Sequence, residues 1–123
     1  MADVIGEGTF EVGDFDKELE AARQGHRQLG TKVLFENDRI RIWEVRLAPG
    51  ERGAFHLHDR HYVWTVVDGG VGLQRSDDGT YKLSRYHVGD TSYQDNTAEN
   101  PMIHDFENAG DAEIRFITTE LLD

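Results

Sequence analysis

The sequence predicts an all-β protein, an antiparallel sandwich or barrel preceded by one short helix. From residue 33 onward, apolar and polar residues alternate with a period of two, as they do in half-buried strands. Turn signals rich in Gly, Asn and Asp separate these segments, and no helical pattern lies between them. Roughly eight to ten short strands with this spacing are typical of sandwiches and barrels.

The first thirty residues differ from the rest. Residues 1–13 are expected to form a loose arm or an edge strand. Asp14 or Asp16 could cap a helix running to about Gln28, because DKELEAARQ is rich in helix-forming residues, and Gly30 would end it. We therefore divide the chain into an arm with a short helix (1–30) and a β-barrel domain (31–123).

Each expected strand after residue 30 is bounded by a turn signal, such as Pro49-Gly50 or the hairpin signal Asp77-Asp78-Gly79. The strands are expected within VLFEN (33–37), RIRIWEVRL (39–47), the histidine-bearing stretch after Gly50, YVWTVV (62–67), VGLQRS (71–76), TYKLSRYHV (80–88), TSYQD (91–95), IHDFEN (103–108) and EIRFITTELL (113–122).

Composition limits the classes of partner. The formal net charge of −11 disfavours nucleic acids and anionic membranes. No cysteine is present, which excludes disulfides, thiolate ligands and a cysteine nucleophile. With neither an apolar run long enough to span a membrane nor a leader-like start, a cytoplasmic protein is the expectation.

Three of the six histidines, His56, His58 and His61, lie within six positions. Residues two apart in a strand point to the same face, so His56 and His58 can share one ion if that face lines the inside of a barrel. Phe55 and Leu57 would then face outward, against a second sheet or a subunit. Imidazole is a ligand for Zn, Fe, Ni and Cu, and for Mn together with oxygen ligands.

The residues around this pair resemble the two motifs of the cupin family. The first motif is a Gly, five residues, His-x-His, three or four residues, an acid, six residues and a Gly; Gly50, His56, His58 and Gly69 or Gly70 match it. The second contains a Gly, a Pro and His-x-x-x-Asn, and here the matching residues are Gly89, Pro101, His104 and Asn108. The resemblance covers residues 33–121.

This resemblance implies a double-stranded β-helix, or jelly-roll barrel, that holds one divalent transition metal (Fe, Zn, Ni, Mn or Cu). His56, His58 and His104 would be its ligands, and Asn108 a structural turn residue. The chain departs from the family where an acidic ligand is expected, because Tyr62 or Val63 stands there. The second motif also departs at Glu99 and Pro101.

His61 is the candidate for the fourth ligand position. Strict alternation turns it away from the ion, but a bulge at Asp59-Arg60 would reset the phase. The alternative is a loop histidine near the mouth of the cavity. Tyr62 is expected to line the cavity as a hydrogen-bond donor.

Further cavity candidates are aromatic or charged. Tyr62, Trp64, Tyr93 and Phe106 could form the wall, although each is also ordinary core material. Glu44 and Arg46 share one strand face. They could point into the barrel, where Arg46 would pair with a substrate carboxylate, or they could form an exposed cross-strand charge ladder.

The sequence thus favours a metal-dependent enzyme acting on a small oxygen-rich metabolite, as a dioxygenase or as an isomerase or lyase. A second interpretation is a small-molecule-binding or sensor module whose metal is structural or absent. A third is an oligomeric scaffold. A homodimer is expected from the resemblance and from the need to cover an apolar edge strand.

Overall fold

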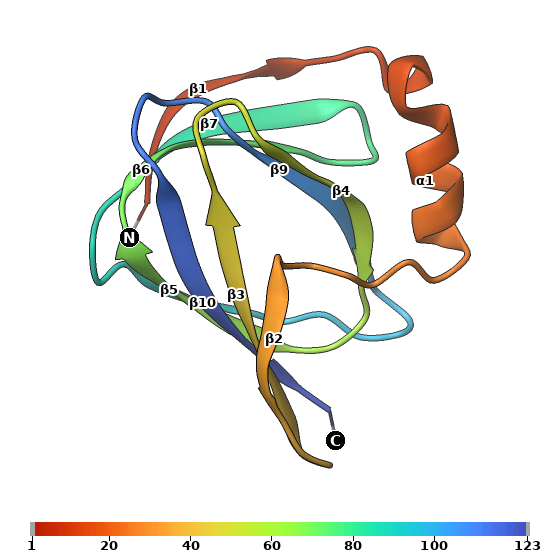
Figure 1. Cartoon of the computed structure of the whole chain (residues 1–123). Coiled ribbons are helices and arrows are strands. Elements are labelled where there is room, and N and C mark those ends of the chain that lie inside the picture. Colours follow the sequence, from red (N-terminus) through yellow and green to blue (C-terminus); the bar gives the residue numbers. More distant parts are fainter. Residues whose placement is uncertain (1, 123) are drawn as a thin grey trace.

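Two five-stranded antiparallel sheets face each other in the computed structural model, which describes residues 2–122 (Figure 1). Sheet A consists, in spatial order, of Asp3–Thr9 (β1), Thr80–Tyr86 (β7), Gly70–Arg75 (β6), Met102–Asn108 (β9) and Arg52–His58 (β4). Sheet B consists of Lys32–Glu36 (β2), Ile40–Leu47 (β3), Ile114–Leu121 (β10), Tyr62–Asp68 (β5) and Thr91–Gln94 (β8). The predicted all-β jelly roll with one N-terminal helix is confirmed.

The N-terminal segment takes the second of its two expected forms. β1 is an edge strand of sheet A and pairs antiparallel with β7. A 3₁₀ turn, Val12–Phe15, and the helix Asp16–Arg23 (α1) follow it. None of the helices in the described part of the chain has the length and apolarity needed to span a membrane.

Helix α1 ends earlier than the sequence predicts. Gly25 has φ +110°, and the N–H groups of Gly25 and His26 each donate to a carbonyl of the last turn at 3.0 Å. This is a Schellman end, in which a glycine in the left-handed region satisfies the final carbonyls. The expectation that the helix continues to Gln28 and ends at Gly30 was therefore wrong, because Gly25 stops it first.

The outer face of sheet A is covered by α1, which lies alongside β4 in Figure 1. Leu19 and Ala22 of the helix pack on Phe55 and Ile103, and all four are buried. Phe55 does face away from the histidines, as expected, but a helix of the same chain covers it. The helix thereby fixes β4 and β9, the two strands that carry the candidate site.

The Pro49-Gly50 turn forms as its residues predict. Gly50 has φ +84°, and the Glu51 N–H donates to the Ala48 carbonyl at 2.9 Å, as in a turn with Pro and Gly at its centre. The Asn108 carboxamide donates to backbone carbonyls at 2.9 and 2.8 Å. It therefore stabilises the chain reversal where β9 ends.

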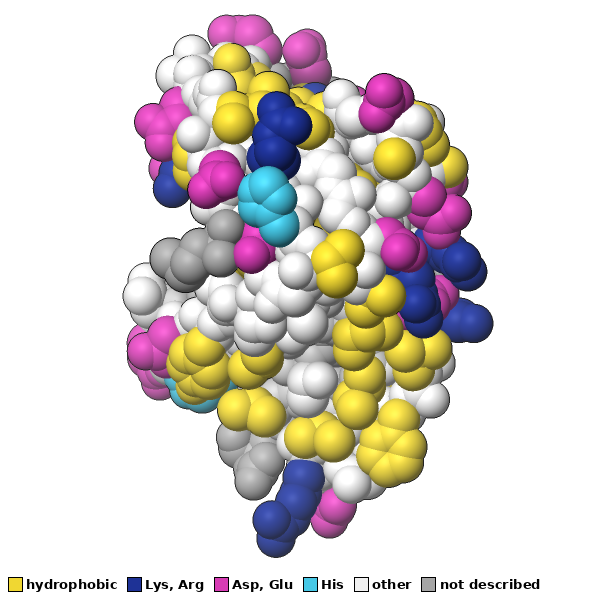
Figure 2. Space-filling model, turned by 90° about the vertical axis from the view of Figure 1, so that its left-hand side faces the viewer, with side chains coloured by type: hydrophobic (Ala, Val, Ile, Leu, Met, Phe, Trp, Pro, Cys, Tyr) yellow, Lys and Arg dark blue, Asp and Glu magenta, His cyan; other side chains and the backbone are white. Residues whose placement is uncertain are grey.

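The outer face of sheet B carries an apolar row. Phe35, Ile42, Val63 and Tyr93 lie on four strands and are joined by direct register pairs through Thr119 of the central strand β10. Phe35 and Tyr93 are more than half exposed. Figure 2 shows apolar side chains gathered over the lower half of the molecule, where Figure 1 places strands of this sheet. The homodimer expected from the sequence stays a prediction.

Candidate metal centre

Strands β4 and β9 bring three histidines together inside the barrel. His56 lies directly opposite His104 in the antiparallel register, and His58 is two residues further along β4 on the same face. All three side chains are buried, with 3%, 3% and 8% of the residue surface exposed for His56, His58 and His104. The pairing of two strands far apart in sequence thus completes the His-x-His pair.

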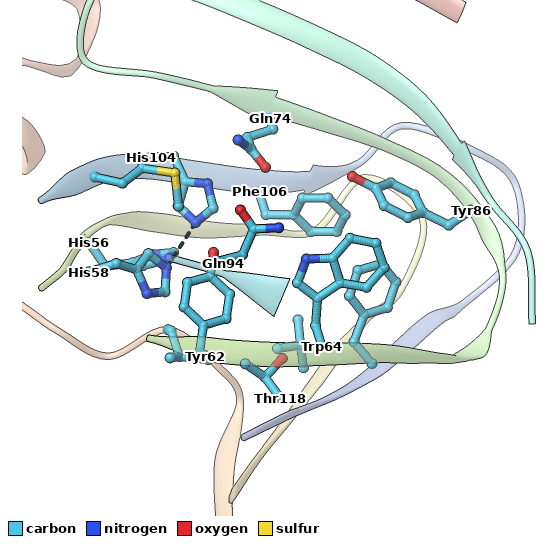
Figure 3. Close-up of a pocket in the computed structure, with 14 residues that line it drawn as sticks. His56, His58, Tyr62, Trp64, Gln74, Tyr86, Gln94, His104, Phe106 and Thr118 are labelled. Carbon is cyan, nitrogen blue, oxygen red and sulfur yellow. Dashed lines mark hydrogen bonds between the residues drawn. The ribbon is translucent and has the colours of Figure 1, made fainter. Parts of the chain in front are cut away.

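The three imidazoles converge on one point. One nitrogen from each lies within 4.8 Å of the others, and His58 Nε2 is 3.0 Å from His104 Nε2 (Figure 3). Two nitrogen ligands at about 2.1 Å from one ion and at right angles to each other are about 3.0 Å apart. The separation of His58 and His104 therefore fits two adjacent ligands of a divalent transition metal.

The protonation of the cluster suits metal binding. Burial lowers the pKa of His56 to about 4 and holds the pKa values of His58 and His104 well below the usual range. The imidazoles are therefore neutral at pH 7, the form that binds metals. His56 Nδ1 donates to the Ala54 carbonyl at 2.8 Å, so its Nε2 lone pair is available.

One buried atom of the three-histidine cluster is unsatisfied. His104 Nδ1 has no hydrogen-bond partner among residues 2–122, although the ring is buried. A buried polar atom without a partner costs free energy and commonly marks a functional site. The burial, the neutral rings and the convergent nitrogens together fit a bound divalent metal.

His61 does not lie in this cluster. It is in the short loop between β4 and β5, where its Nδ1 is 2.8 Å from Asp95 Oδ1 and its ring stacks on Tyr93 at 5.9 Å between centroids. Its side chain is 34% exposed. The alternation of β4 ends at His58, and the loop turns His61 away from the ligands.

Tyr62 occupies the place where the motif has an acid. Its ring stacks on His58 with centroids 4.3 Å apart and an interplanar angle of 21°. Burial raises the pKa of Tyr62, so its hydroxyl stays protonated. Tyr62 thus presents a neutral phenol beside the cluster instead of a carboxylate.

A cavity of about 200 Å³ adjoins the histidines. Three of the predicted wall residues, Tyr62, Trp64 and Phe106, line it. Several residues that were not expected from the sequence also line it: Leu29, Val45, Gln74, Tyr86, Gln94, Met102, Phe116 and Thr118. Gln74 could have been found from alternation, since it shares its strand face with the buried Gly72.

Glu44, Arg46 and Tyr93 lie outside this cavity. Glu44 accepts from Arg115 Nε at 2.8 Å, and Arg46 pairs with Glu113, so both belong to a cross-strand charge ladder on the outer face of sheet B. Tyr93 is 56% exposed on the same face. Of the open alternatives for Glu44 and Arg46, the outward-facing charge ladder is the one observed, but only Arg46 is exposed, because Glu44 is 4% exposed beneath its partners.

The position of β3 in sheet B explains this orientation. Val45 lines the cavity, and Trp43 and Leu47, which share its face, are buried. Glu44 and Arg46 alternate with these residues and must therefore point outward.

Position 72 requires glycine because the rings of Phe106 and Tyr86 lie too close to its backbone for a side chain. A Cβ at this position would overlap the Phe106 ring and lie 3.0 Å from Tyr86 Cε2. We expect Gly72→Ala to lower the free energy of unfolding by about 1–3 kcal/mol, because the methyl group overpacks the wall. Urea denaturation measures this. Gly53→Ala is the matched control, since its Cβ would meet nothing closer than 3.9 Å; an equal loss in both variants would contradict the explanation.

No family model matches this sequence, and no curated protein does. Solved structures do match. A cupin domain from Bordetella pertussis Tohama I superposes with a TM-score of 0.65 at 24% identity, over 79% of this chain and 98% of that one. The chain has the cupin fold.

Other proteins with the cupin fold differ in their described chemistry. A protein described as a predicted oxalate decarboxylase, from Thermotoga maritima, has a TM-score of 0.52 at 19% identity, over 71% of this chain and 70% of that one. A sugar phosphate isomerase of the cupin superfamily, from Silicibacter pomeroyi, has a TM-score of 0.50 at 21% identity, over 68% and 50%. The cupin fold alone therefore selects no reaction, and function must be argued from the site.

Proposed function

We propose that this chain is a metal-dependent enzyme that acts on a small oxygen-bearing molecule, as a dioxygenase or as an isomerase or lyase. His56, His58 and His104 would bind one divalent transition metal. The observation that carries the proposal is the convergence of three buried, neutral imidazoles on the wall of a cavity. Three protein ligands leave positions open for a substrate, as catalytic sites require.

A bound metal would supply Lewis acidity towards a substrate oxygen, or a binding position for dioxygen. The side chains of the cavity would orient the substrate. The Tyr62 hydroxyl can donate a hydrogen bond to a substrate oxygen, because burial keeps it protonated. The carboxamides of Gln74 and Gln94 can donate to or accept from polar groups of the substrate without adding charge.

The binding or sensor module is the second candidate, and one observation favours it. Among the described residues that line the cavity there is no carboxylate or lysine to serve as a proton-transfer group. An enzyme at this site would have to rely on the metal, on Tyr62 or on the substrate itself for proton transfer.

Elemental analysis followed by activity assays tests the proposal. Protein purified without added metal should contain about one transition-metal ion per chain. Oxygen uptake with a panel of small enols, thiols and hydroxy acids detects a dioxygenase, and proton NMR of the same mixtures in deuterium oxide detects isomerisation or cleavage. Stoichiometric metal with turnover supports the enzyme. Metal with no turnover favours the binding module. Protein that binds no metal overturns the proposed metal-dependent enzyme and leaves only a binding module without metal.

A further inference from the structure

The cavity beside the histidines is uncharged. Among the described residues that line it, none carries a carboxylate, an ammonium or a guanidinium group. Its polar groups are the three neutral imidazoles, two tyrosine hydroxyls, the Trp64 indole, the Thr118 hydroxyl and two carboxamides. A charged part of a ligand that enters this cavity would find no opposite charge apart from a metal ion.

Two cations act on the buried Glu120 carboxylate: Arg41, which is in an ion pair, and Arg60. Arg41 lies 2.5 Å from Glu36 and 3.8 Å from Glu120, so two carboxylates hold it. Glu120 is itself buried, two residues beyond Thr118 on the same strand face, and accepts from Trp43 Nε1 at 2.6 Å. The buried charge at this end of the barrel is therefore a carboxylate that already has hydrogen-bond and ion-pair partners. A negative charge would repel an anionic ligand and not bind it.

A second cleft, of about 350 Å³, adjoins the cavity at His56 and Phe106. It contains two guanidinium groups, but neither is free. Arg46 pairs with Glu113 outside the barrel. Arg52 pairs with Glu18 and lies 2.9 Å from the buried Asp105.

The end of the cavity away from the histidines is aromatic. Trp64 stacks on Phe116 with ring centroids 5.4 Å apart. Tyr86 and Phe106 complete the wall, with ring centroids 5.0 to 5.7 Å from the rings they contact. Figure 3 shows the imidazoles at one end, the aromatic rings at the other and the Gln74 and Gln94 carboxamides between them. At about 200 Å³ the cavity is smaller than the usual ligand pocket of about 300–1,000 Å³.

We infer that the substrate is a planar molecule of single-ring size that carries no charge at its far end. Its oxygen atoms would bind the metal at the histidine cluster. Its apolar ring would pack against Trp64, Phe106 and Phe116. Phosphorylated sugars and dicarboxylates would be excluded, because their second charge would be buried without a partner. This substrate class rests on the proposed function, since it assumes a metal bound by His56, His58 and His104.

Three probes of one shape test the charge selectivity. Catechol, 4-methylcatechol and 3,4-dihydroxybenzoate differ only at the position that would face the aromatic wall. Isothermal titration of zinc-loaded protein should give similar dissociation constants for the first two. The carboxylated probe should bind at least about 100-fold more weakly, because its charge cannot be paired. Equal binding of the methyl and carboxyl probes would overturn the inference.

A charge placed in the cavity should reverse the effect. Gln74→Lys should reduce the ratio of the dissociation constants of 3,4-dihydroxybenzoate and 4-methylcatechol at least about tenfold, since it supplies a buried cation. Thr65→Lys adds the same charge on the outer face of sheet B and should leave this ratio of dissociation constants unchanged. An equal reduction of this ratio in both variants would mean that the overall charge of the protein, and not the cavity, disfavours the carboxylated probe. That result would overturn the inference.

The same titrations on chelator-treated protein, with p-cresol and 4-hydroxybenzoate, separate this inference from the proposed function. A protein that does not take up zinc refutes the metal site, but a preference for p-cresol would still support an uncharged cavity. A protein that binds zinc and accepts both kinds of probe equally refutes the substrate class and leaves the metal site standing. Binding of no probe to either form overturns the inference.

Discussion

Replacing His104 by alanine should reduce the metal content from about one ion per chain to near zero while the barrel stays folded. His104 is the ligand contributed by β9, and without it only the two imidazoles of β4 remain. Because substitutions of residues that merely support metal ligands already cost about 10–100-fold in affinity, loss of a ligand should cost at least about 100-fold. Elemental analysis after gel filtration measures the content, and circular dichroism checks the fold.

Thermal unfolding gives a second measurement of the same change. A metal that binds only the folded state raises its stability with concentration, so zinc should raise the Tm of the wild-type protein and leave that of His104→Ala unchanged. His61→Ala is the matched control: it removes a histidine next to β5 that lies outside the cluster. This control should retain the full ion content. A His104→Ala protein with one ion per chain would refute the proposed ligand set.

The fold was predictable because the local signals agree with one another. Period-two alternation marks the strands, and the turn at Gly50 has the backbone angle that its Pro-Gly sequence predicts. The helix end was missed because Gly25 and Gly30 are both acceptable stop signals, and only the hydrogen bonds of the last turn distinguish them.

The candidate site was only partly predictable, for a different physical reason. Alternation tells which residues share a face but not which face is inside. In β3 the outward face carries Ile40 and Ile42 and the inward face carries Trp43, Val45 and Leu47, so both faces are apolar enough to be core. The placing of Glu44 and Arg46 therefore depended on the pairing of β3 with β10, which no local pattern specifies. The His56–His104 pairing is equally non-local, and it was expected only from the resemblance to the two cupin motifs.

A buried carboxylate on the outer side of sheet A should dominate the stability of the site. Asp105 is fully buried and accepts from the Arg75 N–H and from the guanidinium groups of Arg52 and Arg75, each at 2.9 Å. It thereby joins β9 to β6 and β4. Asp105→Asn should lower the free energy of unfolding by about 3–5 kcal/mol, because the amide would turn an N–H₂ group towards a guanidinium and remove the buried carboxylate that Arg52 and Arg75 share. Arg52 would keep only Glu18 and Arg75 only Glu107. Guanidinium chloride denaturation measures the loss.

The same substitution should weaken metal binding, because Asp105 follows His104 on β9 and its partner Arg52 lies on the strand of His56 and His58. Residues that hold ligands in place typically contribute about 10–100-fold to metal affinity, so we expect a loss of about tenfold for zinc. Glu113→Gln breaks the exposed Arg46–Glu113 pair and is the matched control, with an expected effect of about 0–1 kcal/mol on unfolding and none on zinc affinity. If Asp105→Asn destabilised the protein no more than Glu113→Gln does, the carboxylate would not be what holds the ligand-bearing strands together. The rigidity of the site would then have to come from the packing of α1 on Phe55 and Ile103.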